Sequence, residues 1–396
     1  MKKVLSIVMC TAILLSFCSL GLGVSAAESY RIVSPYEDVV WSGDGAWGAY
    51  RGNLHSHTTY SDADVDLASM VKEYYKNGYD FLANSDHAVT GVEWNKAPAR
   101  MPIYAYQAIL GNKQVHLTDE EYEAITTGTY NGRGKKMVCV VGANELNNHS
   151  LSKNHVNGYF LPQSVGNGFG GVENEKGYEK AVKFVDKNGG LSHINHPGDW
   201  IDSNRDPQAV NDRKNIELFG NIILKYDSCL GMEVLNDRNS TTKYDRVLWD
   251  NVLMYTLPYG KTVIGFSNTD AHNLLDTDSS FSVFMMKENN VDNIKKTMQS
   301  GAFFGVTKIL PGNDFEIGPK DGFDLRGKDV PYPMFKSLTV DGHKITATTE
   351  NASEIQFIAN GKVIAKGETN GEAFTLDLDS VENAKDLLYV RVEIKG

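Results

Sequence analysis

The chain has 396 residues, of which 41% are hydrophobic and 22% are charged, a composition that favours a globular protein over a disordered one. Its formal net charge of −11 leaves no surplus of basic residues for tracking long nucleic acid. A local basic patch could still bind a single phosphate group. Part of the acidity would be neutralised if carboxylates gather around divalent cations.

The N-terminal segment begins with two lysines after Met1, continues with an apolar run and ends with small residues up to Ala26. This order is typical of a secretory signal peptide, and we expect cleavage after Ala26. The apolar run is also long enough to serve as an uncleaved membrane anchor. We predict that residues 1–26 are a signal peptide and that the mature protein is secreted, without stable insertion in a membrane.

Four cysteines are present, and cleavage would leave only Cys139 and Cys229. A framework of several disulfides is thereby excluded. The two cysteines could form one bridge in an oxidising compartment, but each lies in or beside an apolar run, which favours buried free thiols.

Residues 27–310 alternate between strand-like apolar runs and helix-like stretches, the pattern of an α/β domain with parallel strands. A helix is predicted between the first two runs, where Asp66 can cap its start and Gly78 can close its end. Two further helices are expected over residues 118–125 and 177–188. The strand-like runs are residues 49–54, 79–84, 137–143, 155–161, 190–194, 231–235 and 262–267.

The chain changes character near residue 311, where prolines and glycines interrupt a stretch with little helical pattern. Short runs with period-two patterning follow, separated by Gly or Asn turns: residues 337–342, 344–350, 354–360, 361–367, 373–379 and 388–394. We predict that residues 311–396 form a linker and a small β-sandwich of the immunoglobulin-like type. This segment carries no cluster of catalytic residue types.

Histidines and acids recur where the strand-like runs of the first domain end. Because residues i and i+2 of a strand face the same side, His55 and His57 can bind one metal from a rigid element. The ends of all strands in an α/β barrel meet on one face, so the motifs are expected to form one site. The candidate ligands are His55, His57, Asp62, His87, Glu145, His155, His196, Asp270 and His272.

Nine donors are too many for one tetrahedral metal, whereas two or three neighbouring metals bridged by a carboxylate would use them all. Glu145 is the best candidate for the bridge, because it combines two oxygens with a longer side chain in the central motif. The mixture of imidazole and carboxylate suits Zn²⁺, Mn²⁺ or Fe²⁺.

The order of these motifs resembles that of the PHP (polymerase and histidinol phosphatase) family of metal-dependent phosphoesterases. The likeness covers roughly residues 49–305 and runs from HxH through an aspartate, SDH, a glutamate, an NH segment and an HP pair to a final DAH. Members of that family have a distorted (βα)7 barrel with two or three metals. The resemblance implies the same fold class and divalent transition metals as cofactors here.

Carried over residue by residue, the resemblance implies three groups of ligands: His55, His57, Glu145 and Asp270 at one metal, Glu145, His155 and His196 at a second, and Asp62, His87 and His272 at or near a third. Many members have a histidine where this chain has Asp62. That departure implies a weaker or absent third metal.

Other polar residues near the motifs have less direct roles. Asp86 is expected to orient an imidazole rather than to bind a metal. His193 could replace His196 as a ligand, although the HP placement favours His196. His149 could reach substrate or be a solvated loop residue. Two further histidines are expected at the surface: His116 and His343.

The resemblance also implies a reaction, the hydrolysis of phosphomono- or phosphodiesters by attack of a metal-bridging hydroxide. Glu145 would act through the bridge, and His87 or His272 could protonate the leaving group. The expected partner is a small phosphorylated substrate. Basic residues near the motifs are candidates for binding its phosphate: Lys153, Arg205 and Arg238.

Two other functions compete with this interpretation. An amidohydrolase-type enzyme, which cleaves C–N or carboxylic ester bonds, also opens with HxH and ends with an aspartate, but Glu145 and the terminal DAH fit the phosphoesterase order better. A binding protein could keep the metals without turnover, although the complete donor set argues against such a loss.

Overall fold

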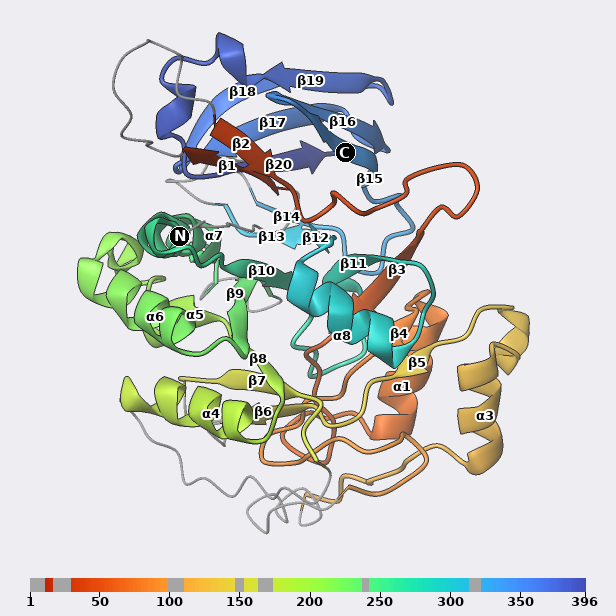
Figure 1. Ribbon diagram of the computed structural model, residues 1–396. Coiled ribbons are helices and arrows are strands. Elements are labelled where there is room, and N and C mark those ends of the chain that lie inside the picture. The colour runs from red at the N-terminus through yellow and green to blue at the C-terminus, as the bar shows by residue number, and fades with distance from the viewer. Residues whose placement is uncertain are drawn as a thin grey trace.

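The computed structural model describes residues 30–98, 110–146, 153–162, 174–236, 242–312 and 322–396, and the backbone of residues 11–16. An α/β part carries the α-helices of these residues, and a second part consists mainly of strands from the C-terminal end of the chain (Figure 1). No helix in the described ranges is long and apolar enough to cross a membrane.

The first sheet of the α/β part has the order β12-β11-β3-β4-β5. Strands β3, β4 and β5 are parallel, whereas β11 is antiparallel to both β3 and β12. The strands are β3 (Gly48–Asn53), β4 (Phe81–Leu82), β5 (Val138–Cys139), β11 (Ser280–Met286) and β12 (Phe303–Thr307).

The second sheet has the order β10-β9-β8-β7-β6. Strands β8, β9 and β10 are parallel, and β7 is antiparallel to both of its neighbours. The strands are β6 (Asn144–Leu146), β7 (Val156–Tyr159), β8 (Leu191–Ile194), β9 (Cys229–Leu235) and β10 (Ile264–Ser267).

Isolated bridges join the ends of the two sheets, between His87 and Glu145 and between Ser56 and Ala271. The residues that follow β4 therefore meet β6, and the residues that follow β3 meet those that follow β10. Each of the seven predicted strand runs overlaps an observed strand, but the expectation of parallel strands throughout is wrong for β7, β11 and β12. An apolar run in the sequence predicts where a strand lies, but it does not predict whether that strand pairs parallel or antiparallel with the next strand of the sheet. The fold is α/β with mixed sheets, and a closed (βα)7 barrel stays a prediction.

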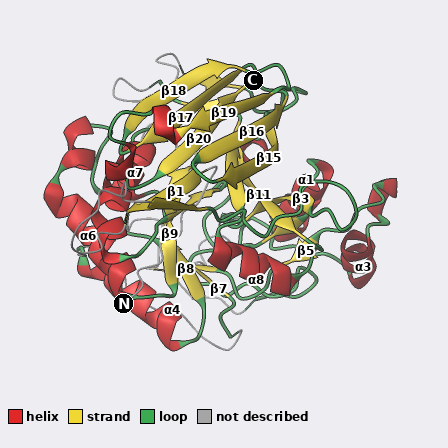
Figure 2. Cartoon of the chain, turned by 45° about the horizontal axis from the view of Figure 1, so that its top comes forward, coloured by secondary structure: helices red, strands yellow, loops and turns green. Residues whose placement is uncertain are grey.

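Helices α4, α6 and α7 lie along one side of the α/β part, and α1 and α3 lie at the other (Figure 2). The predicted cap of α1 is present, since the Asp66 carboxylate accepts a hydrogen bond from the backbone N–H of Ser69. Gly78 follows α1 with a φ of +84°, a left-handed conformation that suits glycine. The helices are α1 (Leu67–Lys76), α3 (Asp119–Thr127), α4 (Lys176–Lys187), α5 (Pro197–Trp200), α6 (Arg213–Lys225), α7 (Asp245–Thr256) and α8 (Val291–Ser300).

The C-terminal strands form two antiparallel sheets, of order β15-β16-β19 and β18-β17-β20-β1-β2. Each of the six runs predicted in this region overlaps one strand. Buried side chains from both sheets, among them Leu338, Ile345, Phe357 and Val392, belong to one hydrophobic cluster. The strands are β15 (Met334–Asp341), β16 (Lys344–Glu350), β17 (Glu354–Ala359), β18 (Lys362–Glu368), β19 (Ala373–Asp377) and β20 (Val390–Lys395).

Two N-terminal strands join this second part. Strand β1 (Thr11–Ser16) pairs with β20 and with β2 (Tyr30–Val33). Residues 30–33 thus lie with the C-terminal strands, whereas the sequence analysis grouped them with the α/β domain. Strand β1 lies inside the predicted signal peptide, whose cleavage stays a prediction.

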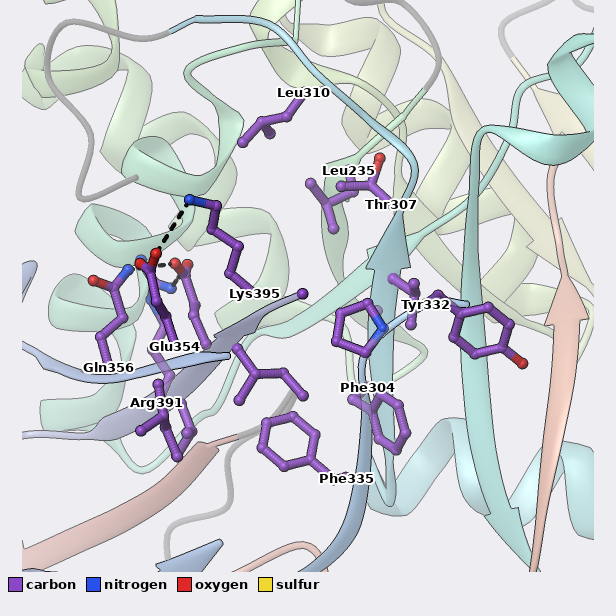
Figure 3. A pocket seen from close by; sticks show the side chains of 18 of the residues that line it. Leu235, Phe304, Thr307, Leu310, Tyr332, Phe335, Glu354, Gln356, Arg391 and Lys395 are labelled. Atoms are coloured by element: carbon purple, nitrogen blue, oxygen red, sulfur yellow. Dashed lines mark hydrogen bonds and ion pairs between the residues drawn. The ribbon is translucent and has the colours of Figure 1, made fainter. Parts of the chain in front are cut away.

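A buried ion pair connects the two parts. Arg391 of β20 donates from Nε and Nη2 to the two carboxylate oxygens of Asp250 on α7, at 2.8 and 2.9 Å. Both side chains are less than a tenth exposed. Beside this pair lies a cleft of about 1480 Å³, lined by strands of both parts and including Phe304, Tyr332 and Glu354 (Figure 3).

The linker before β15 is hydrogen-bonded to the loop that follows β10. Arg326 donates from Nη1 to Asp276 at 2.9 Å, and the backbone N–H of Gly327 donates to Asp278 at 3.0 Å. Lys308, which precedes β13 (Ile309–Leu310), also donates to Asp278 and to the carbonyl oxygen of Lys328. Strand β13 pairs with β14 (Phe323–Asp324) of the linker. The linker is therefore anchored to the loop that carries His272.

Candidate metal centre

His55 and His57 follow directly after β3 and are fully buried. Their Nε2 atoms lie 3.2 Å apart. The backbone of His57 is also held in place, because its N–H donates a hydrogen bond to the carbonyl oxygen of Ala271 at 3.0 Å. The alternation of side chains that the sequence predicted for this pair is therefore present.

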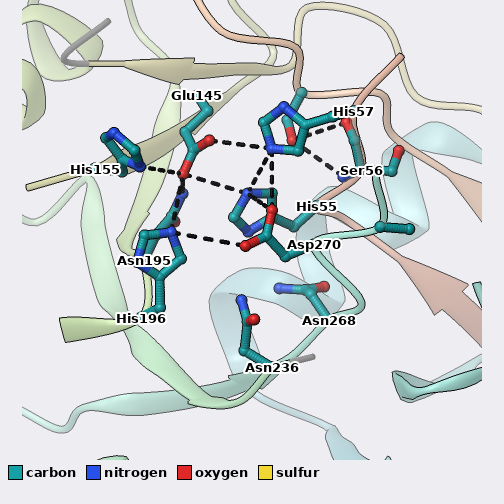
Figure 4. Close-up of polar contacts among 12 residues, drawn as sticks. His55, Ser56, His57, Glu145, His155, Asn195, His196, Asn236, Asn268 and Asp270 are labelled. Atoms are coloured by element: carbon teal, nitrogen blue, oxygen red, sulfur yellow. Dashed lines mark hydrogen bonds and ion pairs between the residues drawn. The ribbon is translucent and has the colours of Figure 1, made fainter. Parts of the chain in front are cut away.

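Four donor atoms converge at this point: His55 Nε2, His57 Nε2, and carboxylate oxygens of Glu145 and Asp270 (Figure 4). The distances from the two ring nitrogens to Asp270 Oδ1 are 3.2 and 3.1 Å, and those to Glu145 are 3.3 and 3.1 Å. A tetrahedral zinc with bonds of about 2.0–2.1 Å separates its ligands by about 3.3 Å. The contacts of the two ring nitrogens with the two carboxylates are therefore close to the ligand spacing around one metal ion.

Glu145 is the centre of the whole cluster. One or other of its oxygens lies 3.0 Å from His155 Nδ1, 3.2 Å from His87 Nδ1 and 3.3 Å from His196 Nε2, besides the contacts to His55 and His57. One buried carboxylate therefore faces five imidazoles. This is the arrangement expected of a residue that bridges two metals.

Two further groups could hold metal, and each contains His87. The first joins His87 with Glu145 and His155, and the second joins His87 with His57 and Asp62. His196 approaches the first of these groups through Glu145. His272 approaches the second, with Nε2 3.5 Å from Asp62 Oδ1. The structure thus brings all nine predicted ligands together, although His87 stands between the second and third groups rather than in the third alone.

Two residues of the cluster have unusual backbones. Asp270 has a φ of +50° and His196 a φ of +23°, in the region that only glycine adopts without cost. Such conformations persist where the surrounding contacts hold them, and they concentrate at functional sites. The Asp270 N–H donates to His55 O at 2.9 Å, which ties its strained backbone to the HxH segment.

The sequence analysis missed the polar layer beneath the cluster. Glu233 on β9 accepts a hydrogen bond from His55 Nδ1 at 2.8 Å, and Asn268 donates to the same carboxylate oxygen at 2.9 Å. Asn195 donates to Glu145 at 2.6 Å. Glu233 lies in a strand run already recognised, and an acid inside a buried strand could have identified it.

The acids strongly bias protons toward the two central histidines. Burial alone would lower the pKa of His57, but its hydrogen bonds to Asp270 and Glu145 raise it to about 10. His55 behaves likewise: Asp270, Glu233 and Glu145 outweigh burial and raise its pKa well above the usual value. Protons on these rings supply the positive charge that divalent cations would supply, so the donor set fits a metal centre.

His87 and Glu145 shift in the opposite direction. Burial lowers the pKa of His87 to about 3, so this ring is neutral at pH 7. Burial would raise the pKa of Glu145, but His155, His87 and His55 hold it well below its usual range. A neutral imidazole and an ionised carboxylate are the forms that bind metals.

His193 lies outside the cluster. Its Nε2 is hydrogen-bonded to the Tyr159 hydroxyl at 2.7 Å, and its ring stacks on Phe266 at a centroid distance of 4.3 Å. His196, not His193, faces Glu145. Asp86 contacts no imidazole among the described residues, but it accepts a hydrogen bond from Ser61, whose hydroxyl lies 3.3 Å from His57 Nδ1. Its predicted orienting role is therefore indirect.

The predicted phosphate-binding residues differ in position. Lys153 lies two residues before His155 and pairs with Asp199 at 3.3 Å, beside the segment that carries His196. Arg205 is exposed and pairs with Asp202 on its own turn. Arg238 and His149 lie outside the described residues. His116 is exposed as expected, whereas His343 is half-buried, stacked on Tyr30 and bonded to Asp379.

Both cysteines of the predicted mature chain are buried and unpaired with each other. Burial raises the pKa of the Cys229 thiol to about 12, and that of Cys139 further. Both thiols are therefore protonated at neutral pH and unreactive.

No family profile and no curated protein matches the sequence. Several solved structures match. A two-domain protein from Bacteroides vulgatus, described as containing a predicted PHP-like metal-dependent phosphoesterase, is 15% identical with a TM-score of 0.43, over 89% of this chain and 88% of that one.

Two more matches have other descriptions. A lesion-specific endonuclease from Pyrococcus furiosus is 13% identical with a TM-score of 0.36, over 65% of this chain and 57% of that one. An amidohydrolase from Chromobacterium violaceum with bound sulfate and no metal is 15% identical with a TM-score of 0.30, over 56% and 87%. The first of the three is described in the terms of the family that the motif order resembles.

Proposed function

We propose that this protein is a metal-dependent phosphoesterase of the PHP type. The observation that carries the proposal is the buried set of His55, His57, Glu145 and Asp270, in which each of the two ring Nε2 atoms lies 3.1–3.3 Å from an oxygen of both carboxylates. Zn²⁺, Mn²⁺ or Fe²⁺ held there would activate water and stabilise charge on phosphoryl oxygens. The number of metals follows from whether the two groups around His87 are also filled.

The chain's own residues can perform the remaining steps. Lys153 stands beside the segments of His155 and His196, where its ammonium group could bind a phosphate oxygen by turning away from Asp199. It would then hold the substrate over Glu145. Arg205 is a weaker candidate because it is exposed and paired with Asp202.

A proton for the leaving group is better supplied by His272 than by His87. The His272 ring is about a fifth exposed, and its Nδ1 donates to the carbonyl oxygen of Asp270 at 2.8 Å, which directs Nε2 toward Asp62. His87 is buried and neutral at pH 7, because burial lowers its pKa to about 3. The neutral His87 ring carries no imidazolium proton that it could give to a leaving group. His272, by contrast, lies at the accessible edge of the site.

The proposed substrates are small phosphomono- or phosphodiesters outside the cell. Support for export comes from the N-terminal pattern, and the formal charge of −11 disfavours long nucleic acid. N-terminal sequencing of the protein from a secreting host tests the export proposal. A mature chain beginning at Ala27 is the expected result.

The function is tested on protein purified without chelator, by metal analysis and by assays with p-nitrophenyl phosphate and bis-p-nitrophenyl phosphate. Glu145→Gln is the informative variant, because it keeps the size of the side chain and removes the charge that faces five imidazoles. Glu217→Gln is the matched control, since Glu217 pairs with Arg213 at the surface of α6. We expect Glu145→Gln to lose metal and turnover together and the control to keep both.

Three results would separate the alternatives. Activity on phosphate esters supports the proposal, and the preferred ester distinguishes a monoesterase from a diesterase. Activity confined to amides or carboxylic esters would instead establish an amidohydrolase. Stoichiometric metal without activity on any of these substrates would favour a metal-holding binding protein.

A further inference from the structure

Glu233 is a fully buried carboxylate on β9 that is not one of the nine predicted ligands. Both of its oxygens are used. Oε1 faces His55 Nδ1 at 2.8 Å and the Asn268 amide at 2.9 Å, and Oε2 accepts from the backbone N–H of His196 at 3.1 Å and from the Asn236 amide at 2.9 Å. Four N–H groups from four different segments therefore converge on one carboxylate.

We propose that Glu233 is a positioning residue that holds His55 and His196 in their ligand geometry at the same time, and thereby couples metal binding at two neighbouring sites. The inference rests on the proposed function, because it concerns the same metal centre. It goes beyond that function by assigning to one residue outside the ligand set the affinity of two sites.

The contact to His55 fixes which ring nitrogen can bind a metal. A neutral ring whose Nδ1–H donates to a carboxylate must present the lone pair of Nε2, and the carboxylate also makes that nitrogen more basic. His55 Nε2 is the atom that faces His57, Asp270 and Glu145. Glu233 thus selects the tautomer that the first metal requires.

The contact to His196 acts on the backbone instead of the ring. His196 has a φ of +23°, an unfavourable conformation for a residue with a side chain. Its N–H would lose a buried hydrogen bond if it turned away from Glu233. The bond therefore helps to keep the His196 ring aimed at Glu145, where Nε2 lies 3.3 Å from Oε1.

The two amides hold the carboxylate in place from the other side. Asn268 follows β10 and also accepts a hydrogen bond from the N–H of Leu54, which directly precedes His55. Asn236 directly follows β9. Glu233 is thereby fixed to four segments that carry ligands or border them, so neither histidine can move without disturbing it.

The test is a titration of the metal-free protein with Co²⁺ alone, followed by its visible absorption, for the natural protein and for Glu233→Gln. Glutamine keeps the volume of the side chain, but its NH₂ group must face at least one of the four donors. We expect the Kd of both sites to rise about 10- to 100-fold, as is usual when a partner of a metal-bound histidine is lost. The Co²⁺ band should also change shape, because the His55 ring is released.

Two further variants keep the test decisive. Glu233→Asp keeps the negative charge on a shorter side chain, and its affinity for Co²⁺ should lie between those of Glu233→Gln and the natural protein. It also provides a test of the proposal if Glu233→Gln folds poorly. Glu217→Gln, at the surface, should bind Co²⁺ like the natural protein. The midpoint of urea unfolding, measured without metal, reports any purely structural effect of each variant.

Each outcome bears on a different claim. An unchanged Kd and an unchanged Co²⁺ spectrum in folded Glu233→Gln, with only a lower unfolding midpoint, would overturn the positioning role. Weakening of one site alone would overturn the coupling. If the natural protein binds no Co²⁺, the metal centre itself is wrong, and the failure lies with the proposed function.

Discussion

Replacing His193 by glutamine is expected to make the metal-free protein less sensitive to acid without removing metal from the native protein. His193 is fully buried between Phe266 and the Tyr159 hydroxyl. Burial lowers its pKa to about 4, against the partial opposition of Glu233. Glutamine can still donate to Tyr159 but has no proton to gain.

The expected size of the effect follows from the two pKa values. The unfolded chain binds a proton at His193 near pH 6.5, whereas the folded chain does so only near pH 4. Unfolding is therefore favoured as the pH falls through this window, by about 2 kcal/mol at pH 5 relative to pH 7. The natural protein should lose this much more stability than His193→Gln between the two pH values.

Urea unfolding of both proteins at pH 7 and pH 5, in the presence of chelator, measures the difference. Other titrating groups, including His57 and Glu145, cancel in the comparison unless the substitution moves them. An equal loss of stability in both proteins would refute the argument that His193 is kept neutral by burial. If folded His193→Gln lost its metal at pH 7 in the absence of chelator, His193 rather than His196 would be the ligand.

Two other substitutions have defined expectations. Arg391→Met leaves the buried Asp250 carboxylate with a hydrogen bond from the Tyr389 hydroxyl but without its ion-pair partner, and should destabilise the protein by about 3–5 kcal/mol in urea unfolding; a loss below about 1 kcal/mol would mean that water reaches the pair. Lys153→Met should raise the KM for p-nitrophenyl phosphate about fivefold at unchanged kcat, since an exposed charge contributes no more than about 1 kcal/mol. Arg205→Met serves as its control, and an equal effect of both would argue against a specific role for Lys153.

Much of the fold could be predicted because its signals are local. The capped start of α1 at Asp66 and the alternating runs of the C-terminal strands depend on neighbours in the sequence, and the structure has them where they were expected. The direction of β7 and β11 could not be read in this way, because pairing partners lie far apart along the chain. The place of strand β2 in the C-terminal sheet could not be predicted either, because it too depends on pairing between segments far apart in the sequence.

The candidate site divides along the same line. The nine candidate ligands could be identified from residue type and from their position after a strand, both of which are visible in the sequence. The division of His87 between two groups is a matter of three-dimensional distance. The role of Glu233 was missed because its partners His55 and His196 are 178 and 37 residues away. Motif order identifies donors, and only packing identifies what holds them.

The hydrogen bonds between the linker and the loop after β10 decide where the chain can be cut into a stable fragment. A fragment ending at residue 310 would contain every predicted metal ligand, yet it would lack Arg326 and the Gly327 N–H, leaving Asp276 and Asp278 with fewer partners four and six residues after His272. The minimal enzyme is therefore longer than its motif-bearing region. Chimeras that keep the α/β part of this chain should also keep the linker through Lys328, because the loop bearing His272 otherwise loses its contacts with Arg326 and Gly327.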